Sequence, residues 1–272
     1  MGKLGDREVS SAKMITKLTL LGTGTFFVST DRSSSAYLLE VDDKKILIDC
    51  GPGTLMRLSQ IGVELEDIDY VFITHLHADH TSDLFSFFMN FRLKDAFSKG
   101  KLSKFPQIFG PQGIDDFLLK LSKAYKLLSV KGWEKIKFLK ANKKQKIGNI
   151  SIESFNVKHI VFGLNANGLA YRFTVGNKVI TFSGDCIKCS GIEKASKEAD
   201  LFICDASYSK RKGSTAHMDT HDIGMISQKS NVKKVVLSHF YPQTDNIDLV
   251  KEVKEKFFGE VIRGKDLMAI SL

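Results

Sequence analysis

The sequence predicts a mixed α/β (α+β) protein in which two packed β-sheets carry helices on their outer faces. Short apolar runs of strand length come first along the chain, and strands then alternate with helix-length stretches in both halves. Turn residues separate these runs, and no repeat or linker interrupts them. Because 272 residues can bury a substantial core, we expect a single domain over residues 14–272. Residues 1–13 are polar, and we expect them to form a flexible leader.

The first half of the chain combines strands with helices. Apolar or alternating runs predict strands over residues 15–21, 36–41, 45–48, 69–74 and 106–109. Helices are predicted from Thr54, over 82–97 and over 111–125. Gly62 suits the residue after a helix and is expected to end the first of these, and Pro111 suits the start of the third.

The second half repeats this alternation. Strands are predicted over residues 147–157, 168–175, 178–182, 199–204 and 233–238, and helices near 192–197, 222–229 and 246–258. Gly176-Asn177 is a hairpin signal between two of the strands. The lysine-rich segment 131–146 also contains Trp133 and Phe138, a composition that can hold nucleic acid. We favour a solvated helix and an edge strand there, since the signal is only compositional.

Composition excludes several classes of protein. No apolar run reaches the length of a membrane span, and residues 1–13 lack the apolar core of a secretory signal. The net charge of +9 favours anionic partners, although lysines on solvated faces are the simpler explanation. The pair Cys186 and Cys189 has no second pair that would complete a structural zinc site. No disulfide framework is visible, which fits a cytoplasmic protein.

Residues 74–80 read Thr-His-Leu-His-Ala-Asp-His, so three of the seven histidines crowd beside one aspartate. Imidazole and carboxylate are the ligands that zinc and similar divalent cations bind. The cluster follows a predicted strand, where loops held by a rigid sheet commonly mount catalytic groups. Four ligands this close cannot easily surround one ion, so we expect two ions that recruit further ligands from elsewhere.

Three more residues of ligand type follow other predicted strands. His159 follows the strand over 147–157, Asp185 follows the strand over 178–182, and His239 follows the strand over 233–238. A single histidine in such a place is more often structural, but the joint pattern delivers a histidine or aspartate at each of four strand ends. This pattern predicts a metal centre, and its nitrogen and carboxylate ligands suit zinc, manganese or iron.

From residue 14 onward the chain resembles the metallo-β-lactamase-fold hydrolases, whose hallmark His-x-His-x-Asp-His stands here at residues 75–80. The resemblance implies a four-layer αββα sandwich with the site at one edge of both sheets. It implies that His75, His77 and His159 hold one metal ion, that Asp79, His80 and His239 hold the second, and that Asp185 bridges them.

Two other segments are similar to the ribonuclease Z and phosphodiesterase branch of that superfamily. The first is the glycine turn at residues 21–25 together with the serines that follow Arg32. The second is Asp205-Ala-Ser-Tyr together with Ser-Thr-Ala-His217, which begins nine residues after Asp205. The resemblance implies that Asp205 pairs with His217, which assists the leaving group. His221 competes for that role, because two residues four apart share one face if both lie in a helix.

The chain departs from ribonuclease Z in two respects. The strand over 168–175 turns directly into the next, so the tRNA-gripping insertion is missing there. Cys186 stands where the branch usually has threonine. A thiol beside a metal centre could ligate metal or be oxidised, but a buried cysteine usually behaves as a small apolar residue.

The sequence thus favours a dinuclear phosphodiesterase. Two divalent cations generate a hydroxide near neutral pH and neutralise charge on phosphate oxygens. Asp79 would orient the bridging hydroxide, and His217, oriented by Asp205, would assist the leaving alkoxide. The expected substrate is a small or single-stranded phosphodiester, such as a cyclic nucleotide. Ribonuclease Z-type tRNA processing is the first alternative; a glyoxalase II-like thioesterase and a non-catalytic nucleic-acid-binding module are further ones.

Specificity is expected in the loops over the site, namely residues 26–35, 85–104 and 165–168. The middle segment contains several phenylalanines, namely Phe85, Phe87, Phe88, Phe91 and Phe97. Most of these should pack in the core, because large apolar side chains are usually buried. An exposed subset would stack on a base or form the contact of a homodimer.

Overall fold

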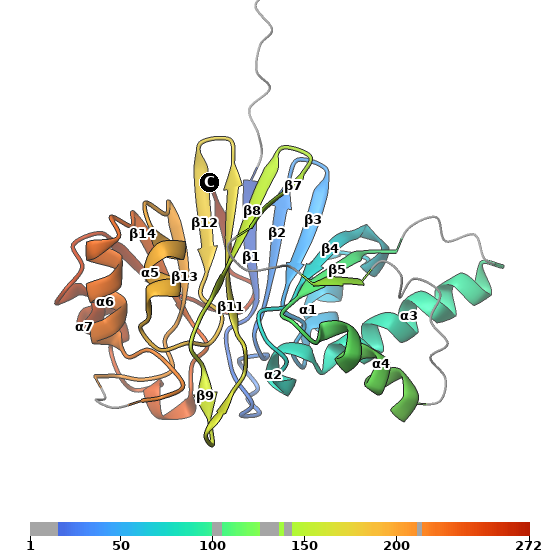
Figure 1. Ribbon diagram of the computed structural model, residues 1–272, viewed down its shortest axis with the longest axis horizontal. Helices are drawn as coiled ribbons and strands as arrows, with labels where there is room; N and C mark the ends of the chain where they lie inside the picture. Colours follow the sequence, from blue (N-terminus) through green and yellow to red (C-terminus); the bar gives the residue numbers. More distant parts are fainter. Residues whose placement is uncertain (1–15, 100–104, 126–135, 139–142, 211–213) are drawn as a thin grey trace, which may run out of the picture.

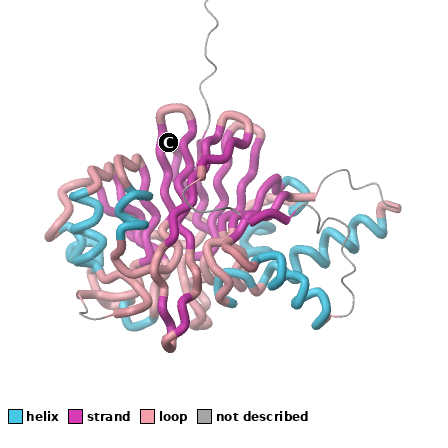
Figure 2. The backbone as a smooth tube through the Cα atoms, in the orientation of Figure 1, coloured by secondary structure: helices cyan, strands magenta, loops and turns pink. Residues whose placement is uncertain are grey.

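The computed structural model describes residues 16–99, 105–125, 136–138, 143–210 and 214–272. The predicted leader over residues 1–13 lies outside them. Two β-sheets face each other in the middle of the molecule, and helices cover the outer face of each (Figure 1). Figure 2 shows the same arrangement, with the strands gathered centrally between two groups of helices.

The first sheet has seven strands, built mostly from the first half of the chain. They are β1 (Thr16–Gly22), β2 (Ala36–Val41), β3 (Lys44–Ile48), β4 (Ile68–Phe72), β5 (Gln107–Gly110), β6 (Ile136–Phe138) and β16 (Ala269–Ser271). Their order is β16-β1-β2-β3-β4-β5-β6, so the last strand of the chain pairs with the first, antiparallel to it. Strands β3, β4, β5 and β6 run parallel to one another.

The second sheet also has seven strands. They are β7 (Lys144–Ile147), β8 (Ile150–Asn156), β11 (Leu169–Val175), β12 (Lys178–Phe182), β13 (Leu201–Asp205), β14 (Lys234–Ser238) and β15 (Glu260–Arg263), in the order β15-β14-β13-β12-β11-β8-β7. Strands β12 to β15 are parallel. A separate small hairpin pairs β9 (Ile160–Val161) with β10 (Leu164–Asn165).

Three hydrophobic cores separate four layers. One core lies between the sheets and contains stacked and edge-on rings of Phe72, Phe109 and Phe173. A second core lies between the first sheet and helices α1 (Thr54–Gln60), α3 (Asp83–Phe97) and α4 (Ile114–Ala124). A third lies between the second sheet and helices α5 (Ser190–Ser196), α6 (Thr220–Lys229) and α7 (Leu249–Lys254). The predicted αββα sandwich is therefore confirmed.

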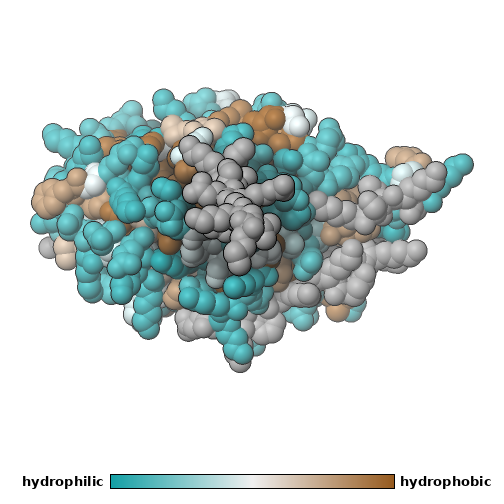
Figure 3. Space-filling model, turned by 90° about the horizontal axis from the view of Figure 1, so that it is seen from above, coloured by the Kyte–Doolittle hydropathy of each residue, from teal (hydrophilic) through white to brown (hydrophobic). Residues whose placement is uncertain are grey.

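The strand directions bring the predicted site residues to one edge of both sheets. In the first sheet β1, β3 and β4 end at this edge; in the second, β8, β12, β13 and β14 do. Two contacts fasten the sheets together beside it: the Tyr171 hydroxyl donates to the Ile73 carbonyl at 2.7 Å, and the Leu169 N–H donates to the Thr74 carbonyl at 2.9 Å. Figure 3 looks onto the opposite end, where hydrophilic residues predominate among those visible and hydrophobic residues gather in small patches.

Several predicted boundaries were wrong. The strand expected over 147–157 begins only at Ile150 as β8, because Gly148, at φ +54°, lies in the turn that follows the end of β7 at Ile147. Within the lysine-rich segment 131–146 the expected edge strand is present, because β6 and β7 each lie at the edge of a sheet, and residues 131–135 and 139–142 lie outside the described chain. Helix α7 is shorter than the expected 246–258. The strands β9, β10, β15 and β16 were not predicted.

The phenylalanine-rich helix α3 mostly serves the core, as expected. Phe87, Phe88 and Phe91 are buried against the first sheet, and Phe85 stacks on Tyr125 of the segment after α4. Phe97 is exposed at the end of the helix. Across the described residues, every helix is too short or too polar to cross a lipid bilayer.

Candidate metal centre

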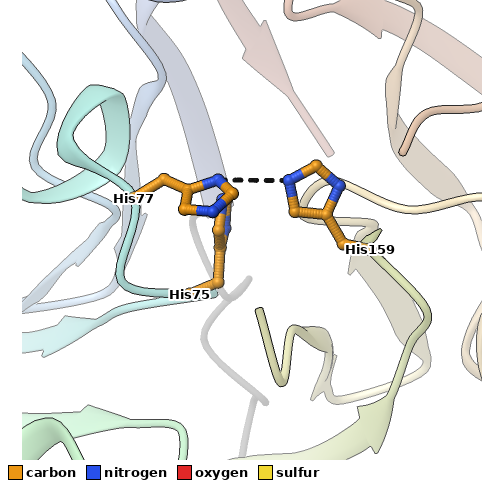
Figure 4. Close-up of side chains that lie close together, drawn as sticks. All are labelled: His75, His77 and His159. Carbon is orange, nitrogen blue, oxygen red and sulfur yellow. Dashed lines mark hydrogen bonds between the residues drawn. The ribbon is translucent and has the colours of Figure 1, made fainter. Parts of the chain in front are cut away.

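Three histidines converge at the shared edge of the sheets. His75 and His77 follow β4, and His159 follows β8. Figure 4 shows His75 and His77 facing His159, with His77 Nδ1 and His159 Nε2 only 3.1 Å apart. Each of the three can offer one nitrogen to a common point, since their candidate ligand atoms lie within 4.8 Å of one another. His75 and His159 are buried, and His77 is half-buried.

A second group of ligand-type residues lies directly beside the first. It comprises Asp79 and His80 on the short helix α2 (Ala78–Thr81), Asp185 after β12, and His239 after β14. His239 Nε2 lies 3.3 Å from both His80 Nε2 and Asp79 Oδ2. All four side chains are buried. The scattered residues that the sequence singled out are therefore brought together.

Asp185 lies between the two groups. Its carboxylate is 3.7 Å from His75 Nε2 and 3.8 Å from His159 Nε2 on one side. On the other side it is 3.3 Å from both His80 Nε2 and His239 Nε2. One carboxylate can thus serve two neighbouring cations.

The donor atoms fit divalent cations. His75 Nε2 and Asp79 Oδ1 are buried and have no hydrogen-bond partner among the described residues. A buried polar atom without a partner is costly, and coordination to a cation would satisfy both atoms. Imidazole nitrogens with carboxylates form the ligand set of zinc and similar metals.

The two groups differ in their electrostatics. Burial lowers the pKa of His75, His77 and His159, which keeps these imidazoles neutral and able to donate a lone pair. Burial also opposes protonation of His80 and His239, but the carboxylates around them, Asp185 foremost, outweigh it. The pKa of His80 is therefore raised, and that of His239 is raised to about 10. The acidic second group thus attracts positive charge.

A buried aspartate that the sequence reasoning missed orients two of these histidines. The Asp49 carboxylate, after β3, accepts a hydrogen bond from His80 Nδ1 at 2.7 Å and another from the Thr74 hydroxyl at 2.9 Å. The Thr74 hydroxyl in turn lies 3.1 Å from His75 Nδ1. With Nδ1 held in this way, Nε2 of each imidazole is directed at the centre, which is how outer partners tune metal ligands.

Asp205 plays the corresponding part on the second sheet. Its carboxylate is 2.8 Å from His217 Nδ1, and it accepts a hydrogen bond from the Ser207 hydroxyl. That hydroxyl lies 2.9 Å from Nδ1 of His239. Each buried aspartate therefore holds one histidine directly and a second one through a hydroxyl group.

His217 adjoins the centre, and His221 does not. Helix α6 begins at Thr220, so His217 lies in the loop before it, and the two histidines share no helix face. His217 is buried, with Nδ1 3.9 Å from Asp185, whereas His221 is exposed. Burial opposes protonation of His217, but the charge and hydrogen bond of Asp205 outweigh it and raise the pKa of the imidazole. This imidazole is therefore protonated more readily than an isolated histidine would be.

Tyr241 was also missed. Its hydroxyl lies 3.4 Å from His217 Nε2, and its half-buried ring packs edge-on against His217 and His239. Sequence position offers a weak signal, since Tyr241 follows His239 by two residues. Asp49 follows β3, and only the parallel pairing of β3 with β4, which the sequence does not reveal, places it beside the centre.

The environment of the cysteines favours a structural role over metal ligation or oxidation. Cys186 and Cys204 are buried among the apolar residues under α5 and α6, and burial raises the pKa of both thiols well above the usual range. Cys189 is half-buried. Neutral thiols in this setting act as small apolar side chains.

This fold, with histidines and aspartates gathered at one edge of its two sheets, defines a metal-dependent hydrolase of the metallo-β-lactamase fold. Within that class, the chain belongs to the family described as Anti-Pycsar protein Apyc1, whose model matches residues 16–263.

Individual known proteins share the fold and the hydrolase class. A ribonuclease Z of Methanosarcina acetivorans is 24% identical over 305 residues, covering 94% of this chain and 98% of that protein. The metallo-β-lactamase fold protein YhfI of Bacillus subtilis superposes with a TM-score of 0.82 at 22% identity, over 95% of this chain and 100% of that one. The short form of human tRNase Z gives a TM-score of 0.72 at 22% identity, over 93% and 98%.

Proposed function

We propose that the protein is a phosphodiesterase that uses two divalent cations, zinc in the first instance, to hydrolyse a small or single-stranded phosphodiester such as a cyclic nucleotide. The observation that carries this proposal is the position of Asp185, within 3.8 Å of nitrogen ligands from both groups. We also propose that residues 14–272 act as one domain, because each group draws ligands from both sheets. A cytoplasmic location fits the buried, reduced cysteines.

In this proposal His75, His77 and His159 hold one cation, Asp79, His80 and His239 hold the other, and Asp185 bridges them. When bound, such a pair of cations activates water and neutralises charge on phosphate oxygens.

The protein's own groups then divide the remaining work. Asp79 would ligate the second cation through one carboxylate oxygen and orient the attacking water through the other, since its Oδ1 has no hydrogen-bond partner among the described residues. Asp205 accepts from Nδ1–H of His217 and stabilises the protonated imidazole, so that Nε2–H faces the leaving oxygen and donates a proton or hydrogen bond to it.

The test uses two substrates that differ in their leaving group. Adenosine 3′,5′-cyclic phosphate releases an alkoxide, which needs protonation, whereas bis-p-nitrophenyl phosphate releases a stable phenolate. A chelator should abolish both reactions. His217→Ala should slow hydrolysis of the cyclic nucleotide by ~10²–10⁴-fold and affect the nitrophenyl ester much less.

His221→Ala is the matched control, because it removes an exposed imidazole four residues away, and it should leave both rates unchanged. Metal-loaded protein that hydrolyses neither substrate would contradict the proposed function. Equal losses on both substrates in the His217 variant would contradict only the role of His217. Elemental analysis of the purified protein should return close to two equivalents of metal.

Ribonuclease Z-type tRNA processing is the second candidate, favoured by the names of the sequence relatives. Against it, Val175 pairs with Lys178 across the two-residue turn between β11 and β12, which leaves no room for a tRNA-gripping arm there. Cleavage of a precursor tRNA at its 3′ end would favour it. Turnover of a glutathione thioester, or salt-dependent binding of single strands without turnover, would favour the two remaining alternatives.

A further inference from the structure

The loop between β1 and β2 displays apolar side chains at its tip. Phe26 is 57% exposed, Phe27 54% and Val28 fully, and none of the three belongs to a hydrophobic core. Single exposed apolar residues are ordinary, but three in succession on one loop indicate a binding surface.

The base of this loop is firmly held. The Asp266 carboxylate accepts hydrogen bonds from the Thr23 N–H, the Thr23 hydroxyl and the Ser33 N–H, at 2.9, 2.8 and 2.7 Å. It also pairs with Arg57 at 3.0 Å. Because both ends of the loop are fixed in this way, the exposed rings are presented on a supported base, and the loop loses less conformational entropy when a ligand binds.

The tip borders the metal centre. The ring of Phe26 lies 6.4 Å from that of His77, and the ring of Phe27 lies edge-on to Tyr241 at 5.5 Å. Tyr241 in turn contacts His217 at 5.5 Å, so one ring separates Phe27 from the residue proposed to meet the leaving oxygen. An open cavity of about 340 Å³ adjoins Phe27, with Arg32 and Asp245 in its lining.

We propose that Phe27, supported by Phe26, forms a stacking subsite for the nucleobase of the substrate. This inference rests on the proposed function, since it places a base one sugar away from a phosphate held at the metal centre. Every base offers an aromatic face, so stacking on such rings tolerates different bases. The Arg32–Asp245 ion pair, which faces the same cavity, supplies polar groups for the edge of the base.

The experiment compares adenosine 3′,5′-cyclic phosphate with methyl riboside 3′,5′-cyclic phosphate, which has the same scissile bonds but no base. The wild-type protein, with its metal, should prefer the nucleotide in kcat/KM by roughly 5- to 100-fold, the range expected for one base–aromatic stack. Phe27→Leu should remove most of this preference, by slowing hydrolysis of the nucleotide far more than that of the base-free substrate.

Two control variants carry the same exchange elsewhere. Phe258→Leu changes an exposed ring just before β15, at the end of the sheet opposite the site, and Phe162→Leu changes one on the β9–β10 hairpin near the site. Neither should alter the preference. All three rings are largely exposed, so their loss should leave folding intact.

Calorimetric binding of adenosine 5′-monophosphate and ribose 5-phosphate gives a second readout that needs no turnover. If neither cyclic phosphate is hydrolysed, the proposed function fails, while tighter nucleotide binding that Phe27→Leu abolishes would still support the subsite. Equal rates and equal binding with and without a base would overturn it. So would an equal loss on both substrates, or a Phe27 variant that dissociates a dimer of the wild-type protein.

Discussion

Asp49 offers the sharpest test of how the centre is held. Oδ1 of its carboxylate accepts from the Thr74 N–H at 2.7 Å, and Oδ2 accepts from His80 Nδ1 and from the Thr74 hydroxyl. In Asp49→Asn one oxygen becomes an NH₂ donor of nearly the same size. If the remaining oxygen stays with the Thr74 N–H, the new NH₂ group faces His80 Nδ1.

The consequence follows from the tautomer of His80. Facing a donor, the imidazole presents its Nδ1 lone pair and moves its proton to Nε2, the atom that points toward Asp185 and His239. Nε2 then cannot ligate a metal. We expect metal affinity at the second group to fall by ~10–100-fold. Loss of a charge-assisted hydrogen bond should also reduce the free energy of unfolding by roughly 1.5–3 kcal/mol.

The assay is competition with a chromophoric chelator, combined with thermal unfolding. Asp69→Asn is the matched control: Asp69 is a buried carboxylate near the start of β4, away from the site, where it accepts from the Lys45 N–H at 2.8 Å. That variant should lose stability but keep its metal affinity. A folded Asp49→Asn protein that holds all its metal as tightly as wild type would refute the reasoning.

Two further outcomes follow from the geometry. Removing metal with a chelator should lower the melting temperature by roughly 5–10 °C, because a cation present at about a hundred times its Kd contributes about 2.7 kcal/mol; calorimetry with and without chelator checks this, and an unchanged transition would argue against a bound cation. Gly51→Ala should lower stability by ~1–3 kcal/mol and weaken metal binding, because the new Cβ would sit 2.0 Å from the Asp79 carbonyl oxygen and 2.8 Å from Ser34 Cβ. Denaturant unfolding and metal titration measure the two effects. A variant with wild-type stability and metal affinity would show that this turn can accommodate a Cβ atom.

The strands were predictable from the sequence where one face, or both faces, of the strand are buried. The strands β12 and β14 are short apolar runs, and the Gly176-Asn177 turn forms between β11 and β12 as its sequence indicates. Sequence patterns failed where a turn hides inside an alternating run, as at Gly148. They also failed at the short edge strands β15 and β16, whose partly exposed residues carry little pattern.

The residues of the site likewise fall into those that the sequence revealed and those that it did not. Histidines and aspartates just after apolar runs were visible in the sequence, because strand ends that share an edge gather their loops. The groups that orient them were not visible. Asp49 precedes Cys-Gly-Pro-Gly and so looks like a turn residue, and only the parallel pairing of β3 with β4 places it beside His80. Ser207 and Tyr241 likewise gain their roles only when β13 and β14 lie side by side.

The return of β16 to the sheet of β1 makes the end of the chain structurally indispensable. Residues 264–272 cap the hydrogen-bonding edge of β1, from Lys17 to Thr19, and carry the Asp266 carboxylate that anchors the following loop. A shortened chain would leave that edge open to pairing with another molecule, a known route to aggregation. It would also release the loop between β1 and β2 that carries Phe26 and Phe27, so truncation should impair substrate selection as well as solubility.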